Sequence, residues 1–99
     1  MIYAYLFMTQ SPSVFKFGVT KNKTPMDRIQ LYYGLNKPSK IICICMCEED
    51  FELKFKQKID NDKHFERPSL LGKEWVRVVD PNYEPVASDY LKKLFYDTL

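Results

Sequence analysis

The sequence predicts an α+β domain with a small, mainly antiparallel, three-stranded sheet flanked by helices and followed by an extra C-terminal helix. Two short apolar segments joined by a polar turn open the chain, and apolar residues recur at helical spacing farther along. The chain has 99 residues, of which 45% are hydrophobic and 15% aromatic, so it can build one hydrophobic core. We therefore expect one domain, and this length excludes multi-domain enzymes and large cofactor folds.

The first two strands are expected at residues 3–8 and 14–20. The apolar residues 1–8 lack the basic start and the small-residue cleavage pattern of a signal peptide, so they favour a strand. Residues 9–13 form a polar, proline-containing turn of hairpin length. Gly18 interrupts the second strand, which predicts close approach of another backbone or a ligand there.

The next two elements are a helix and a third strand. Thr24 suits the N-cap of a helix, Pro25 its first position and Gly34 its left-handed C-cap, so a helix is expected from residue 24 to about residue 33. Residues 41–47 are apolar on both faces, which predicts a strand that is central or well covered.

The second half of the chain predicts two further helices. Phe51, Phe55 and Ile59 recur at helical spacing after a run of acids that suits the positive end of a helix. A polar loop is expected at residues 61–72 and a short strand at 74–79. A linker then leads to a closing helix at 86–99, whose apolar stripe is formed by Ala87, Leu91, Leu94, Phe95 and Thr98.

The three cysteines alternate along the third predicted strand. Cys43, Cys45 and Cys47 would therefore place their sulfur atoms in a row about 7 Å apart. Tetrahedral zinc needs ligands that converge to about 2.3 Å, so we interpret these residues as core. A redox or metal protein built on them is a disfavoured hypothesis. An odd number of cysteines so close together favours a reducing compartment, the cytoplasm or nucleus of a host cell, over a disulfide framework.

Other chemistry has little support in the sequence. His64, the single histidine, stands in a charged loop with no neighbour that orients it, so we interpret it as a solvated residue rather than a catalyst. Three glycines cannot form a glycine-rich phosphate loop. No segment approaches the roughly 18 consecutive apolar residues of a membrane span, so no membrane association is expected.

A phenol opens the first predicted strand, an ammonium lies in the segment that ends the second, and a guanidinium and a carboxylate lie in the first turns of two predicted helices. They belong to Tyr3, Lys16, Arg28 and Glu52. Phosphodiester hydrolysis needs a base that activates water, cations that stabilise the developing charge and a carboxylate that holds a divalent ion. The plainer alternatives are a core aromatic for Tyr3 and an ordinary exposed helix acid for Glu52.

Five short motifs in this order resemble the GIY-YIG nuclease superfamily, above all its short phage- and DNA-virus-type branch. The resemblance spans residues 1–79 as a nuclease core and leaves residues 80–99 as a linker and a helix packed on the same domain. The motifs are Ile2-Tyr3, Phe15-Lys16-Phe17-Gly18-Val19-Thr20, Arg28-Ile29, Phe51-Glu52-Leu53 and Glu74-Trp75-Val76.

The resemblance implies a metal-dependent DNA endonuclease in viral or phage-type DNA processing. Tyr3 would act as general base or its relay, with Tyr5, of the same strand parity, as the alternative phenol. Arg28 would bind the scissile phosphate, and Glu52 would coordinate Mg²⁺ or Mn²⁺. Lys16 stands where the second motif usually has a tyrosine, and would position water or neutralise phosphate.

The expected partner is DNA. The net charge of +2 does not identify a partner, but Lys21, Lys23, Lys37 and Lys40 flank the predicted site on loops and would hold a DNA backbone without reading sequence. Cleavage would then be structure-specific or weakly sequence-specific. Lys16 and Met1 depart from the family motifs, which leaves a second hypothesis: an inactive nuclease-fold module that binds DNA or a protein partner. The oligomeric state stays open, a homodimer included.

Overall fold

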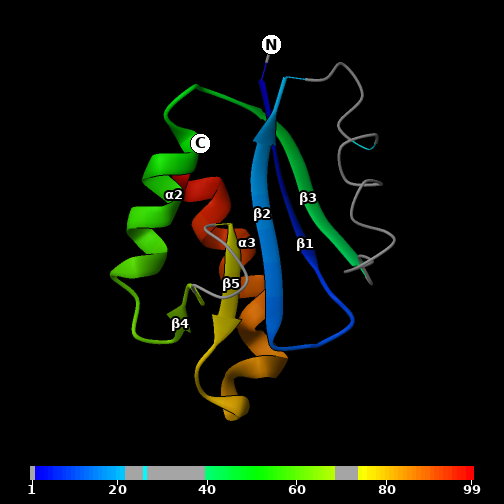
Figure 1. Cartoon of the computed structure of the whole chain (residues 1–99), viewed down its shortest axis with the longest axis vertical. Coiled ribbons are helices and arrows are strands. Elements are labelled where there is room, and N and C mark those ends of the chain that lie inside the picture. The colour runs from blue at the N-terminus through cyan, green and yellow to red at the C-terminus, as the bar shows by residue number, and fades with distance from the viewer. Residues whose placement is uncertain (1, 22–25, 27–39, 69–73) are drawn as a thin grey trace.

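The computed structural model describes residues 2–21, 26, 40–68 and 74–99 (Figure 1). Except for Met26, the helix expected from residue 24 lies outside these residues. The described elements are β1 (Ile2–Met8), β2 (Val14–Thr20), β3 (Lys40–Cys47), α2 (Phe51–Asp60), β4 (Phe65–Glu66), β5 (Trp75–Val78), the 3₁₀ helix η1 (Pro81–Tyr83) and α3 (Glu84–Thr98). No helix in these ranges is long and apolar enough to cross a bilayer.

The strands form one antiparallel sheet in the order β3-β1-β2-β5-β4. The α+β class and the β1–β2 hairpin are confirmed, but the expected number of three strands is wrong. The predicted short strand joins the sheet as β5, beside β2, and β4 forms within the predicted polar loop. There Phe65 pairs with Val78 and is buried. Two residues are too few to leave an alternating pattern in a sequence.

A central position for β3 is wrong, because β3 is the end strand of the described sheet, but the alternative of a covered strand holds in part, since only Lys40 and Met46 of β3 are exposed. One face of β3 packs into the core through Cys43, while on the other face the side chain of Met46 is 60% exposed. An apolar residue on the outer face of a strand is common in folded proteins, so apolarity on both sides did not establish a central position.

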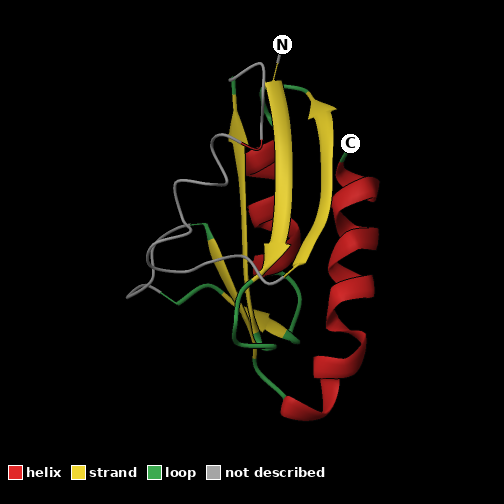
Figure 2. Ribbon diagram, turned by 90° about the vertical axis from the view of Figure 1, so that its right-hand side faces the viewer, coloured by secondary structure: helices red, strands yellow, loops and turns green. Residues whose placement is uncertain are grey.

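Both described helices cover the same face of the sheet (Figure 2). The centroid of the Phe55 ring lies 5.0 Å from that of Phe17 in β2, and the Phe51 centroid lies 4.7 Å from that of Phe95 in α3. The sheet, α2 and α3 therefore share one aromatic core. The predicted stripe of α3 is confirmed, since its buried residues are Ala87, Leu91, Phe95 and Thr98.

The opposite side of the β1–β2 hairpin carries a different set of side chains. Strand alternation places Tyr3, Tyr5 and Phe7 of β1 there, and the register sets them opposite Thr20, Gly18 and Lys16 of β2. We call these six residues the hairpin face. Tyr5 and Phe7 form a second apolar cluster with Met26, Ile41 and Ile44.

Candidate functional site

Gly18 gives the hairpin face room for a buried tyrosine. A Cβ atom at this position would lie 2.5 Å from the hydroxyl oxygen of Tyr5 and 2.7 Å from its Cζ, closer than Cβ atoms come to other heavy atoms. Something does approach Gly18 closely, but it is the side chain of Tyr5 and not the backbone or ligand that the sequence predicted. Tyr5 itself is only 1% exposed.

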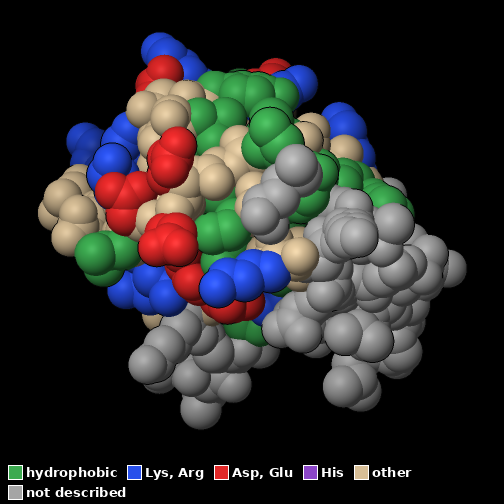
Figure 3. Space-filling model, turned by 90° about the horizontal axis from the view of Figure 1, so that it is seen from above, with side chains coloured by type: hydrophobic (Ala, Val, Ile, Leu, Met, Phe, Trp, Pro, Cys, Tyr) green, Lys and Arg blue, Asp and Glu red, His purple; other side chains and the backbone are tan. Residues whose placement is uncertain are grey.

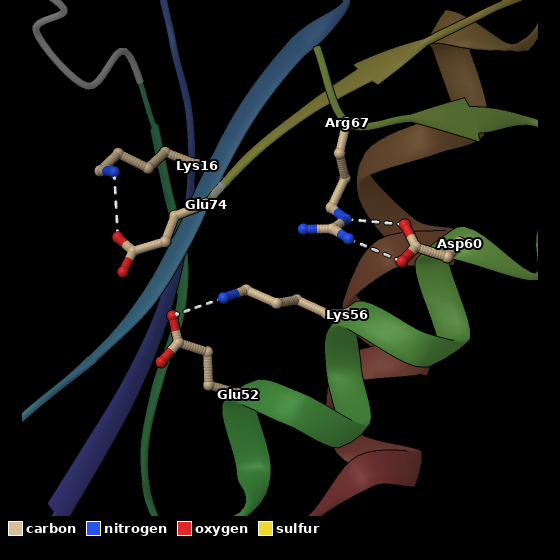
Figure 4. Close-up of polar contacts among 6 residues, drawn as sticks. All are labelled: Lys16, Glu52, Lys56, Asp60, Arg67 and Glu74. Atoms are coloured by element: carbon tan, nitrogen blue, oxygen red, sulfur yellow. Dashed lines mark hydrogen bonds and ion pairs between the residues drawn. The ribbon is translucent and has the colours of Figure 1, made fainter. Parts of the chain in front are cut away.

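Lys16 is a buried cation that joins two strands. The side chain is directed onto β5, where its Nζ lies 3.2 Å from Oε2 of Glu74 and 4.7 Å from the ring centroid of Trp75 (Figure 4). Lys16 is 4% exposed and pairs with Trp75 in the sheet. The second and the last motif of the sequence, 58 residues apart at these side chains, are thus in contact.

Tyr3 and Lys16 share the hairpin face but stand at different points along it. Tyr3 is opposite Thr20 and Lys16 is opposite Phe7, four residues farther along β1. Four residues of antiparallel strand span roughly 13 Å. Tyr5 lies between them in register, but Tyr5 is buried whereas Tyr3 is half-buried. Burial, rather than register, distinguishes the two candidate phenols.

Glu52 comes from the other layer of the molecule. It lies in the first turn of α2, where an acid suits the helix dipole, and its carboxylate forms an ion pair of 3.2 Å with Lys56 one turn later. Figure 4 shows this pair and the Lys16–Glu74 pair as separate contacts beside β2. Glu52 thus approaches β2 from the helix layer, whereas Tyr3 and Lys16 belong to the hairpin face.

Glu52 is the one residue that the sequence predicts as a ligand of a magnesium ion. Within the described ranges, no three His, Cys, Asp or Glu side chains are grouped to hold a metal ion. Mg²⁺ is commonly held by one or two carboxylates and completes its shell with water and substrate phosphate. The partly exposed carboxylate of Glu52 fits that role once Lys56 is exchanged for the ion.

The structure describes two of the four predicted DNA-binding lysines, Lys21 and Lys40. Lys21 follows β2 and lines a cavity of about 430 Å³ with Ile2, Val19, Thr20 and Glu49. Exposed Lys40 pairs with Met8, five residues along β1 from Tyr3, which is roughly 17 Å of strand. Lys21 and Lys40 therefore stand near opposite ends of β1. Viewed from above, basic and acidic side chains are interspersed over the described surface (Figure 3).

Three predicted site residues, Arg28, Lys23 and Lys37, lie outside the described residues. The sequence also placed Glu74 and Trp75 in a motif without assigning them to the site. Their contact with Lys16 depends on the pairing of β5 with β2, and short β5 gave no signal of that pairing.

His64 is oriented by a neighbour, so its interpretation as an unoriented residue is wrong. Its Nδ1 lies 2.8 Å from Oδ1 of Asp62, and its ring stacks on Tyr83 at 4.2 Å between centroids. The backbone N–H of His64 also donates to Oδ1, at 2.9 Å. An aspartate two residues before the histidine in a turn is the signal that could have revealed this contact.

The core interpretation of the cysteines is confirmed. Cys43 is buried, and Cys45 and Cys47 are partly buried and pack against the same core. Burial, with a smaller effect of Cys45, raises the pKa of the Cys43 thiol to about 12. The Cys43 thiol therefore stays protonated at neutral pH, a form that is neither nucleophilic nor a metal ligand.

Comparison with protein-family models, with curated proteins and with solved structures finds no match to this chain. The resemblance to GIY-YIG nucleases therefore depends on the short motifs of this sequence.

Proposed function

We propose that this chain is a metal-dependent DNA endonuclease of the GIY-YIG type, structure-specific or weakly sequence-specific, that acts in viral or phage-type DNA processing. The contact between Lys16 and Glu74 carries the proposal. It joins the second and the last motif on neighbouring strands, next to the strand that holds Tyr3. A shared site needs the motifs to meet, and this contact brings two of them together.

In this proposal each site residue has one role. Tyr3, which is partly exposed, serves as general base or relays the proton to it. Lys16 and Arg28 stabilise the charge that develops on the phosphate. Glu52 would hold Mg²⁺ or Mn²⁺, which would supply stabilisation of the charge that develops on the leaving oxygen. Lys21, Lys23, Lys37 and Lys40 contact the DNA backbone.

The ion pair between Glu52 and Lys56 sets a requirement for this chemistry. The Glu52 carboxylate must exchange Lys56 for the metal ion, so cleavage should need more metal than an unpaired carboxylate would. Exposed ion pairs contribute at most about 1 kcal/mol, and both side chains of the Glu52–Lys56 pair are partly exposed. The exchange therefore presents a modest barrier.

The test uses purified protein with plasmid, fork and flap DNA in the presence of Mg²⁺ or Mn²⁺. Arg28→Ala and Glu52→Gln should each lower the cleavage rate by about 100-fold or more, because each removes charge stabilisation from the transition state. Asp97→Asn, which neutralises an exposed acid on α3, is the control and should cleave like the wild type. Circular dichroism checks that each variant folds. Cleavage unaffected by the Arg28 and Glu52 changes would overturn the proposal.

The second candidate is a nuclease-fold module that binds DNA or a protein partner without cleaving. The departures of Met1 and Lys16 from the family motifs favour it, as does the distance of roughly 13 Å along β1 between the positions of Tyr3 and Lys16. Salt-dependent DNA binding with no cleavage on any substrate would support the DNA-binding form. If the protein neither binds nor cleaves DNA, the hypothesis of a module that binds a protein partner would remain.

A further inference from the structure

We propose that Glu74 is a positioning residue that holds the Lys16 ammonium in place on the hairpin face, so that the reaction meets a fixed positive charge. This inference rests on the proposed function and deepens it. The sequence assigned Lys16 to the site and left Glu74 without a role.

The burial of Lys16 is the first step. A lysine that is 4% exposed has lost nearly all of its hydration, and a buried charge is costly unless a counter-charge and hydrogen bonds replace the lost water. Glu74 supplies both through a hydrogen-bonded ion pair of 3.2 Å. The face of the Trp75 ring, 4.7 Å from Nζ, adds a favourable contact with the cation.

The main chain fixes Glu74 beside Lys16. The backbone N–H of Phe17 donates to the carbonyl oxygen of Glu74 at 3.0 Å, and Lys16 pairs with Trp75 in the ladder. Glu74 is thus attached to β2 at the residue next to Lys16. Strand pairing fixes the backbone of Glu74, and the ion pair of 3.2 Å then directs its carboxylate toward the lysine.

A fixed ammonium has a consequence that a mobile one lacks. Lysine carries its charge on a flexible four-carbon stem, and holding that stem in one arrangement costs side-chain entropy. Because Glu74 and Trp75 already hold the lysine stem in the folded protein, this entropy is lost on folding and not on substrate binding. Charges already aimed at the reacting group, in a site with little water, stabilise a transition state more than charges that must reorganise.

A second ion pair on the same strand offers a matched control. Arg77 of β5 pairs with Glu66 of β4, and both side chains are about half exposed. This pair also links β5 to a neighbouring strand, but at an edge of the sheet and with partners in contact with water. Glu66→Gln therefore removes a comparable interstrand ion pair without touching Lys16.

The experiment compares cleavage kinetics of Glu74→Gln, Glu74→Asp and Glu66→Gln. We expect Glu74→Gln to lower kcat by about 10- to 100-fold with KM for DNA little changed, since a transition-state interaction is weakened. Glu74→Asp, which keeps the charge, should recover part of the loss, and Glu66→Gln should match the wild type. Exchanging the two residues, with Lys16→Glu and Glu74→Lys together, should restore thermal stability but not kcat.

A second measurement does not depend on cleavage. The side-chain ammonium of Lys16, assigned in nitrogen-15 NMR spectra by its loss in Lys16→Arg, should give a signal at neutral pH because the ion pair and burial slow its hydrogen exchange. That signal should vanish in Glu74→Gln and persist in Glu66→Gln.

The outcomes separate the inference from the proposed function. If wild-type protein cleaves and Glu74→Gln cleaves equally well, the inference is wrong while the nuclease proposal stands. Full kinetic rescue by the exchanged pair, or an ammonium signal that survives Glu74→Gln, also overturns it. If wild-type protein cleaves nothing, the nuclease proposal fails and the catalytic use of Lys16 fails with it. The NMR signal then upholds or overturns the positioning of Lys16 by Glu74.

Discussion

The hydroxyl of Tyr90 donates a 2.5 Å hydrogen bond to Oδ2 of Asp62, which ties α3 to the turn after α2. The other oxygen of this carboxylate contacts the backbone N–H and the ring of His64. Burial favours a raised pKa for Asp62, but the hydrogen bonds from Tyr90 and His64 outweigh it, and the pKa is lowered. The same contact raises the pKa of Tyr90 to about 12.

Replacing Tyr90 with phenylalanine should destabilise the protein at pH 7. The ring stays, but a partly buried carboxylate loses a hydrogen bond, which typically costs about 1–3 kcal/mol. The measurement is the free energy of unfolding from urea denaturation. Tyr96→Phe on the same helix serves for comparison: it removes the hydroxyl of an exposed tyrosine, whose hydrogen bond with Cys45 involves a thiol and not a carboxylate, so it should cost less. Equal stability of Tyr90→Phe and the wild type would contradict the structural role of this hydrogen bond.

The contribution of Asp62 should disappear in acid. Its folded-state pKa lies below the ordinary value of 3.8, so the ionised carboxylate stabilises the folded state above about pH 4. As the pH falls through the folded pKa, both states become protonated and this stabilisation is lost. The difference in unfolding free energy between wild type and Asp62→Asn should therefore be largest near neutral pH and narrow below pH 4. A difference that stays constant from pH 7 to pH 2.5 would exclude this linkage.

Adding one methyl group at Gly18 should strain the hairpin face. In Gly18→Ala the new Cβ meets the Tyr5 ring, and overpacking of this kind costs about 1–3 kcal/mol. In a Tyr5→Ala background the obstructing ring is absent, so the same change should cost much less. A double-mutant cycle of unfolding free energies measures this coupling. Equal costs in the two backgrounds would show that another contact limits position 18.

The closing helix should be essential to the stability of the core. Phe95 is fully buried against Phe51 and Phe55, so Phe95→Ala should cost about 3–5 kcal/mol, enough to unfold much of a small domain. Leu99→Ala, near the end of the same chain segment, alters a half-exposed side chain and should change stability by less than about 0.5 kcal/mol. Thermal unfolding followed by circular dichroism distinguishes them. A cooperative wild-type-like transition in Phe95→Ala would contradict the position of this ring.

Local patterns predicted the hairpin, α2 and α3 because each pattern spans a few residues. The aromatic and apolar content of β1 favours a strand, and the spacing of Phe51, Phe55 and Ile59 indicates which side of α2 faces the core. The edge position of β3 and the pairing of β4 with β5 depend on partners distant in the chain, and periodicity contains no information about such partners.

In the candidate site, too, local features could be predicted from the sequence and contacts between distant residues could not. Tyr3, Lys16 and Glu52 were recognisable from short motifs, and strand parity places the first two on one face. The structure adds the ion pairs of Lys16 with Glu74 and of Glu52 with Lys56. The first joins residues 58 positions apart and became visible only with the sheet. The second follows helical spacing and was within reach of the sequence.

The packing of α3 on β1, β3 and α2 also bears on how the protein is made. Part of the cover of Ala4 and Leu6 consists of Leu91 and Phe95, which are synthesised close to ninety residues later. Until then, a nascent chain exposes an apolar sheet surface that neighbouring chains or chaperones can bind. Contacts so far apart in sequence slow folding, so we expect the final core to close after synthesis of this segment rather than during it.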